Sequence, residues 1–138
     1  MIILDTNVLS ALMHATPQRE VVAWLDLQPS ESVWTTSITV FEARMGLHLL
    51  PAGRRRQALE SAFAILLEEK LENRVLPFDE TAATEAASMA AKRQRAGRPV
   101  DFRDTQIAGI VMARRAVLAT RNLRHFEDFQ VQIVNPWE

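Results

Sequence analysis

Short hydrophobic runs and longer amphipathic segments alternate along this chain. The hydrophobic runs are bounded by polar or turn-forming residues, which is typical of strands buried inside a sheet. One run contains Pro77, and because proline lacks an amide donor it favours a sheet edge or a strand end. We therefore predict strands at 2–5, 33–35, 75–78, 117–119 and 131–134.

The segments between these runs have the spacing of amphipathic helices, with hydrophobic side chains recurring every three to four positions. Gly97 directly follows one such segment, and glycine is common just after a helix end. Because strands alternate with helices, we expect an α/β fold in which helices cover both faces of a mostly parallel sheet. The predicted helices are 7–13, 18–28, 39–50, 53–72, 80–96 and 104–115.

The length of 138 residues indicates a single domain, 1–138, that buries roughly 70% of its unfolded surface. No repeat or linker divides it. The absence of cysteine excludes disulfides, zinc–thiolate sites and thiol catalysis. The N-terminus lacks a basic region followed by a long apolar one, and no apolar stretch approaches the ~18 residues of a membrane span. We therefore expect a cytoplasmic protein without a membrane partner.

The formal net charge of −1 gives no overall attraction to nucleic acid, but the positive charges are clustered. Local basic clusters can hold phosphates without a basic total. The alternative is that they are solvated helix faces. The clusters lie at Arg54–Arg56, Lys92–Arg98, Arg114–Arg115 and Arg121–His125. The three histidines show no triad or metal-ligand spacing; His125 could contact a phosphate, but we expect a surface role for all three.

Three acidic residues stand at the ends of predicted elements. Asp5 follows the first strand, Glu42 comes early in the third helix, and Asp104 opens a later one. Each has a structural alternative. Asp5 or Thr6 can cap the first helix, residues 39–42 fit a capping box, and Asp104 can be an N-cap.

Considered together, these acids suggest a site. Helix N-termini and strand C-termini share one edge of a parallel α/β domain, so the three carboxylates can converge. Clustered carboxylates repel each other unless a cation neutralises them or one is protonated. Oxygen ligands without His or Cys favour Mg²⁺ or Mn²⁺, which suits phosphodiester hydrolysis. Asp79 also lies between a strand and a helix, but no further ligands are near it, so we predict an N-cap; Asp101 is left open as a residue of the rim.

Several motifs resemble those of PIN-domain ribonucleases of the VapC toxin family, in particular its FitB-like branch. Each motif is weak alone, but the ordered set is specific and spans nearly the whole chain. The motifs are Ile3–Val8, Thr36–Gly46, Pro77–Asp79, Asp104–Gly109, Ala119–Asn122 and Val134–Trp137.

The resemblance implies a three-layer α/β/α fold with a five-stranded sheet. It also implies a toxin of a type II toxin–antitoxin system, an endoribonuclease that depends on Mg²⁺ or Mn²⁺. Asp5, Glu42 and Asp104 match the family's catalytic, metal-binding carboxylates. Polar residues that orient ligands or water in the family match Thr6, Asn7 and Thr120.

Asn122 departs from the family pattern, which often has a fourth acid at this place. Its amide oxygen can still bind a cation or position a metal-bound water, but it brings no negative charge, so a second cation should be held less firmly. We therefore predict one well-bound cation in the free protein. The alternative is that Asn122 caps the segment 123–126. Arg121, Arg124 and Arg93 of the Lys92–Arg98 cluster are candidates for contacts with RNA phosphates.

The resemblance further implies a homodimer that a cognate antitoxin protein binds and inhibits in a larger assembly. Operator DNA would be bound only through the antitoxin. Two other functions stay open. The first is a phosphoacceptor signalling domain, although such domains have adjacent acids near the first strand and a lysine near the end. The second is a non-catalytic PIN scaffold that binds a partner protein, which Asn122 makes conceivable.

Overall fold

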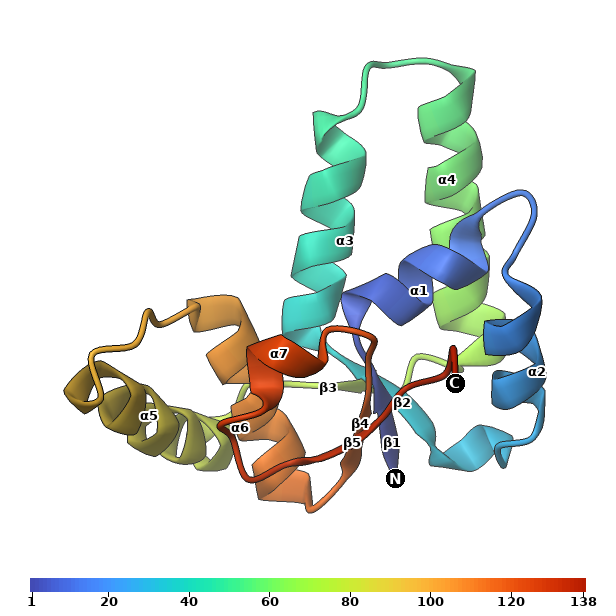
Figure 1. Cartoon of the computed structure of the whole chain (residues 1–138). Coiled ribbons are helices and arrows are strands. Elements are labelled where there is room, and N and C mark those ends of the chain that lie inside the picture. The colour runs from blue at the N-terminus through green and yellow to red at the C-terminus, as the bar shows by residue number, and fades with distance from the viewer.

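A computed structural model describes all 138 residues and confirms the three-layer α/β/α fold. The sheet occupies the middle layer, with helices on both sides (Figure 1). Every pair of neighbouring strands is parallel, and the strand order is β3-β2-β1-β4-β5. The strands are β1 (Ile2–Leu4), β2 (Val33–Thr36), β3 (Val75–Leu76), β4 (Val117–Ala119) and β5 (Gln132–Val134).

The central strand β1 explains the unbroken hydrophobic run at the start of the chain. Ile2 pairs with Val33 of β2 on one side and with Val117 of β4 on the other. Successive strand residues face opposite sides of a sheet. Accordingly, Ile3 belongs to the core on one face and Leu4 to the core on the other, and both are fully buried.

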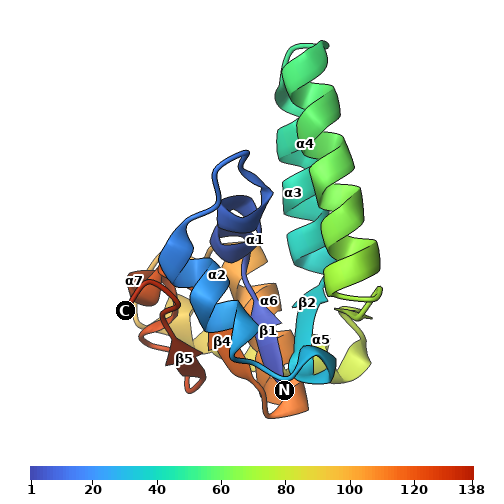
Figure 2. The same ribbon diagram turned by 90° about the vertical axis from the view of Figure 1, so that its right-hand side faces the viewer.

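The core that contains Leu4 is covered by the first four helices and a helical turn. Val8, Val21 and Phe63 are fully buried there. Helices α3 and α4 form a hairpin that projects beyond the sheet (Figure 2). The elements are α1 (Thr6–Met13), α2 (Arg19–Asp26), η1 (Ser30–Ser32, a short 3₁₀ helix), α3 (Ser37–Leu49), α4 (Arg54–Ile65) and η2 (Leu66–Lys70, a π-helical turn that continues α4).

The core that contains Ile3 is covered by α5 (Glu80–Arg95), α6 (Phe102–Arg114) and α7 (Leu123–Phe126). Gly109 allows α5 and α6 to pack closely, because a Cβ there would lie 2.5 Å from the Ala82 carbonyl oxygen. The predicted stop of α5 at Gly97 is confirmed, since Gly97 has a φ of 71°.

Two other predicted elements differ from the structure at one end. The predicted strand 75–78 is shorter, because β3 ends before Pro77, and β3 is an edge strand as the proline indicated. The helix predicted from residue 104 begins at Phe102 instead. No helix is long and apolar enough to cross a membrane.

Candidate active site

Asp5 lies directly beyond the central strand and is 4% exposed. Its carboxylate accepts hydrogen bonds from the Thr6 amide (2.8 Å) and from the Thr120 hydroxyl (2.8 Å). Burial raises the pKa of Asp5, and these hydrogen bonds counter only part of that rise. Asp5 therefore caps α1, as the structural alternative predicted, and also contacts the residue that follows β4.

A network of polar side chains joins the ends of β1 and β4. The Asn7 amide donates to the Thr120 hydroxyl (3.0 Å) and to Asp5 (3.3 Å). In return, the Asn7 side-chain oxygen accepts from the Arg121 amide (3.2 Å). The backbone N–H of Asn122 donates to the Thr120 hydroxyl (3.1 Å). Asp5 is consequently held from two neighbouring strands, which fixes its carboxylate in place.

Glu42 reaches the same place from α3, the helix that follows β2. Its carboxylate accepts a hydrogen bond from the Thr6 hydroxyl (3.2 Å). The capping-box alternative is wrong, because α3 begins at Ser37 and the Thr36 hydroxyl accepts from the Thr39 amide (3.0 Å). Burial, and next the nearby charge of Asp5, raise the pKa of Glu42.

Asp104 lies in the first turn of α6. It is not the N-cap of this helix; that role belongs to Asp101, whose carboxylate accepts from the Asp104 amide (3.1 Å). Burial, and next the charge of Asp101, raise the pKa of Asp104 to about 6. The ring Nδ1 of His125 lies 3.0 Å from the Asp104 carboxylate.

The three carboxylates face one small cavity of about 160 Å³ that has no hydrophobic lining residue. The structure thus brings together six of the predicted residues, and Thr120 lies behind Asp5. Arg103 and His125 were not predicted here. His125 follows Asn122 by one helical turn, which could have indicated it, whereas nothing in the sequence singled out Arg103. The lining residues are Asp5, Thr6, Asn7, Glu42, Asp101, Arg103, Asp104, Asn122 and His125.

The chemistry of these side chains suits a divalent cation. Apart from His125 and the positively charged Arg103, they offer carboxylate, hydroxyl and amide oxygens, and hard oxygen donors favour Mg²⁺ or Mn²⁺. Burial is the main cause of the raised pKa values of all three carboxyls, and a nearby cation would favour their ionised forms. In this arrangement Glu42 lies 3.7 Å from Arg103, and no three acidic or histidine side chains converge on one point.

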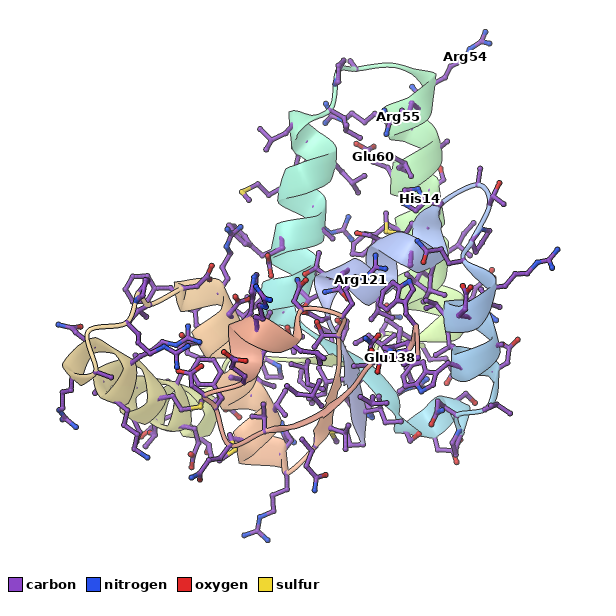
Figure 3. The ribbon with its side chains drawn as sticks, viewed as in Figure 1. His14, Arg54, Arg55, Glu60, Arg121 and Glu138 are labelled. Carbon is purple, nitrogen blue, oxygen red and sulfur yellow. The ribbon has the colours of Figure 1, made fainter.

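Of the three arginines that were predicted to contact RNA, Arg93 and Arg124 line one cavity, whereas Arg121 does not line it. Arg121 lies beside α1 (Figure 3), and its guanidinium stacks 4.2 Å from the centre of the Trp137 ring. Arg124 is exposed. The prediction for Arg93 loses support, because this side chain is only 8% exposed and its Nε donates to Asp128 (2.8 Å). An arginine that is bound to a carboxylate in this way has little charge left for a phosphate and mainly holds the fold together.

The predicted cap at Asp79 is confirmed, since its carboxylate accepts from the Ala82 amide (3.0 Å) at the start of α5. Asp79 is exposed and does not line the acidic cavity. Asn122 stands at the N-cap position of α7, but its side chain makes no capping hydrogen bond. The capping alternative for Asn122 is therefore wrong.

Comparison with known proteins agrees with this architecture over the full chain. Residues 2–131 match the PIN domain. The chain is 40% identical to the VapC ribonuclease Y4jK of Sinorhizobium fredii, over 100% of this chain and 99% of that protein. It is 34% identical to the toxin FitB of Neisseria gonorrhoeae, over 99% of both chains.

A solved structure shows the same likeness in three dimensions. A chain in the structure of FitAB bound to an IR36 DNA fragment superposes with a TM-score of 0.88 at 34% identity, covering 100% of this chain and 96% of that one. The five-stranded parallel sheet, the acidic cavity at its carboxyl edge and these matches lead to one assignment. This protein belongs to the PIN-domain family, in the group that contains the VapC and FitB proteins.

Proposed function

We propose that this protein is a metal-dependent endoribonuclease and the toxin component of a type II toxin–antitoxin system. The observation that carries the proposal is the meeting of Asp5, Glu42 and Asp104 in a cavity without hydrophobic lining at the carboxyl edge of a parallel sheet. The relatives named a VapC ribonuclease and a toxin support a nuclease role.

The three carboxylates would hold Mg²⁺ or Mn²⁺, which supplies positive charge for the phosphodiester and lowers the pKa of a water molecule. Thr120 and Thr6 keep the Asp5 carboxylate in one orientation through their hydrogen bonds. Asn7 and Asn122 present polar groups at the cavity without adding charge. Arg103, at the rim beside Glu42, would donate to a phosphate oxygen.

The number of tightly bound cations follows from the charge of the cavity. Asp5, Glu42 and Asp104 line it together with Asp101, whose carboxylate already accepts from the Asp104 amide as the cap of α6. Asn122 stands where relatives of this type often have a further acid, and its amide adds no negative charge. We therefore expect one well-bound cation per chain in the absence of RNA. Calorimetric titration of the free protein with Mn²⁺ measures this number, and two sites of equal affinity would contradict the expectation.

We further propose that the chain binds a cognate antitoxin protein and contacts operator DNA only through it. The solved FitAB relative is a complex on DNA. This chain also has an apolar cavity of about 690 Å³ between α1, α2 and α4, which is suited to a hydrophobic segment of a partner. Leu12, Val22 and Leu59 are among the residues that line it.

A homodimer is the expected form of the free protein. Exposed hydrophobic residues recur at every fourth position of α3, where Phe41 is 59% exposed, Met45 38% and Leu49 78%. This spacing places them on one face of the helix. An apolar helix face that projects from the protein is typical of a surface that meets another chain. Light scattering of the purified protein tests the dimer.

The phosphoacceptor alternative loses support, because position 121 is an arginine that stacks on Trp137 and no lysine lines the acidic cavity. The non-catalytic scaffold remains the competing function. A cleavage assay with purified single-stranded RNA and Mn²⁺ decides between them. We expect cleavage that EDTA abolishes, and none from Asp104→Asn purified in the same way, a control that excludes a contaminating nuclease. Equal cleavage by the variant would refute the proposed function.

A further inference from the structure

A second cavity adjoins the acidic one and shares part of its wall. This second cavity has a volume of about 410 Å³ and is lined by residues of the loop 96–101, the start of α6 and α7, together with Arg93 of α5. Asp101, Asp104 and His125 line both cavities. The two are therefore neighbouring compartments of one groove. The remaining lining residues of the second cavity are Arg93, Arg98, Pro99, Val100 and Arg124.

One of its arginines is part of the protein framework. Arg93 binds both oxygens of Asp128, at 2.8 and 2.5 Å, and donates to the His125 carbonyl oxygen (3.0 Å). Its guanidinium also lies 4.4 Å from the centre of the Phe129 ring. The nearby Arg93 guanidinium lowers the pKa of Asp128, so the pair stays ionised at neutral pH. Arg93 thus fixes the α7 wall of the second cavity against α5.

The other two arginines keep charge that is available to a ligand. Arg98 is 45% exposed, and its guanidinium nitrogens lie 3.6 Å from Asp128 and 3.9 Å from Glu127. Such long, solvated contacts are weak, and the Asp128 oxygens are already bound by Arg93. Arg124 is exposed, and no carboxylate lies within ion-pair distance of it. Two guanidiniums therefore stand beside a cavity that opens next to the acidic pocket.

We infer that the second cavity is a subsite for an RNA phosphate that flanks the cleaved bond, bound by Arg98 and Arg124. The inference rests on the proposed function and adds to it the direction in which the RNA strand leaves the acidic cavity. One phosphate of the strand would occupy the acidic cavity, and the next one along the strand would meet the two guanidiniums directly. Arginine suits this task, since its planar guanidinium binds phosphate oxygens in pairs.

The ligand is a nucleic acid strand and not an acidic peptide. A strand carries a phosphate at every nucleotide, so it can place one in each of two adjoining compartments. A peptide carries carboxylates only where aspartate or glutamate occurs, so it does not regularly supply an anion to both compartments. A ligand that spans both compartments is therefore best matched by a nucleic acid strand, which carries phosphates at regular intervals.

The first experiment measures RNA binding without cleavage. Fluorescence anisotropy in EDTA is used with a labelled pool of short single-stranded RNAs of random sequence. We expect Arg98→Gln and Arg124→Gln each to weaken binding by about fivefold to tenfold and to reduce the slope of log affinity against log salt by about 1. Arg114→Gln is the matched control, since Arg114 is exposed at the opposite end of α6 and lines neither cavity.

The second experiment locates the phosphate by double substitution. In oligomers cleaved at one bond, a neutral methylphosphonate replaces the phosphate on one side of that bond and then on the other. With the unmodified oligomer, we expect Arg124→Gln to raise KM and to leave kcat unchanged within about twofold. With the methylphosphonate on the side of the bond that meets the second cavity, the same substitution should no longer raise KM, whereas with the methylphosphonate on the other side it should still do so. Additive effects on both sides would overturn the inference.

The outcomes separate the two proposals. Unchanged affinity and salt slope in both arginine variants, with normal RNA cleavage by the wild type, would refute the subsite and leave the nuclease function intact. If the wild type cleaves no RNA, the proposed function fails, while the binding experiment in EDTA still decides the subsite. A DNA pool of the same length is the final comparison: loss of affinity in the variants with both polymers supports phosphate recognition, and loss with neither contradicts it.

Discussion

Asp5 and Asp79 occupy equivalent places in the sequence but have different environments in the structure. Each follows a parallel strand at the same edge of the sheet, and each caps the helix that comes next. Asp5 nevertheless is almost fully buried among polar side chains, whereas Asp79 is exposed. The difference shows that a carboxylate after a strand becomes part of a site only when the strand has the right neighbours.

Strand order is the cause of this difference. Asp5 follows β1, which has β2 and β4 on its two sides, so Glu42 from the helix after β2 and Thr120 from the end of β4 both reach it. Asp79 follows β3, which is an edge strand with a neighbour on one side only. Beside Asp79, the segment after β3 is joined to the start of α3 by the Phe78 backbone N–H, which donates to the Ser37 hydroxyl (3.3 Å).

The largest effect is expected for Asp5→Asn. Changing a single group that merely supports a metal ligand typically costs 10- to 100-fold in activity, so loss of a ligand should lower RNA cleavage by at least about 100-fold. Asp79→Asn should keep cleavage within about twofold of the wild type, since asparagine caps a helix as well as aspartate does. Initial rates with Mn²⁺ at saturating RNA measure both variants. Equal losses in the two variants would show that the central and edge positions do not differ in function.

A smaller effect is expected for Thr120→Val, which removes the hydroxyl that donates to Asp5 but keeps the shape of the side chain. The Asp5 carboxylate then loses one of the groups that fix its orientation. We expect Mn²⁺ affinity to fall by about 10- to 100-fold. The free energy of unfolding should fall by only about 1 to 3 kcal/mol, which is typical for a lost buried hydrogen bond. Calorimetric titration measures the affinity. Unchanged Mn²⁺ binding would mean that Thr120 only supports the fold.

Much of the fold could be predicted because its signals are local. The hydrophobic runs marked all five strands to within two residues, and Gly97 and Pro77 marked the ends of elements correctly. The closeness of α5 and α6 could not be predicted, since it depends on Gly109 meeting Ala82 and Ala86 from another helix. Only the assembled structure shows which glycine has a neighbour.

The candidate site was predictable in its acids but not in its basic residues. Asp5, Glu42 and Asp104 follow from the rule that helix starts and strand ends share one edge. Local capping patterns misled at residues 39–42, because the actual cap of α3 is three residues earlier, at Thr36. For Arg93, a cluster of like charges suggested an exposed face, whereas its partner Asp128 is 35 residues away in the sequence. Pairing over such a distance leaves no local signal.

A third test uses the pH dependence of stability to measure the cost of burying the Asp104 carboxylate. The pKa of Asp104 is about 6 in the folded chain, above its ordinary value of 3.8. At pH 8 the ionised carboxylate therefore disfavours folding, and this penalty decreases as the pH falls through 6 towards 4. In EDTA, Asp104→Asn should raise the free energy of unfolding at pH 8 by on the order of 1–3 kcal/mol, and the gain should vanish near pH 4. Urea unfolding at several pH values measures it, and a variant less stable than the wild type at pH 8 would refute the account.

The smallest expected effect concerns the cap at the edge of the sheet. Asp79→Ala removes the acceptor for the Ala82 amide at the start of α5, and such a loss typically costs about 1 kcal/mol. Serine at this position is also a good cap, so Asp79→Ser should restore most of the stability. Neither variant should alter Mn²⁺ affinity, since Asp79 does not line the acidic cavity. Thermal unfolding and Mn²⁺ titration of the same samples measure both quantities. A fall in Mn²⁺ affinity in Asp79→Ser would mean that the edge acid acts on the central site, and strand order would then not explain why the two acids differ.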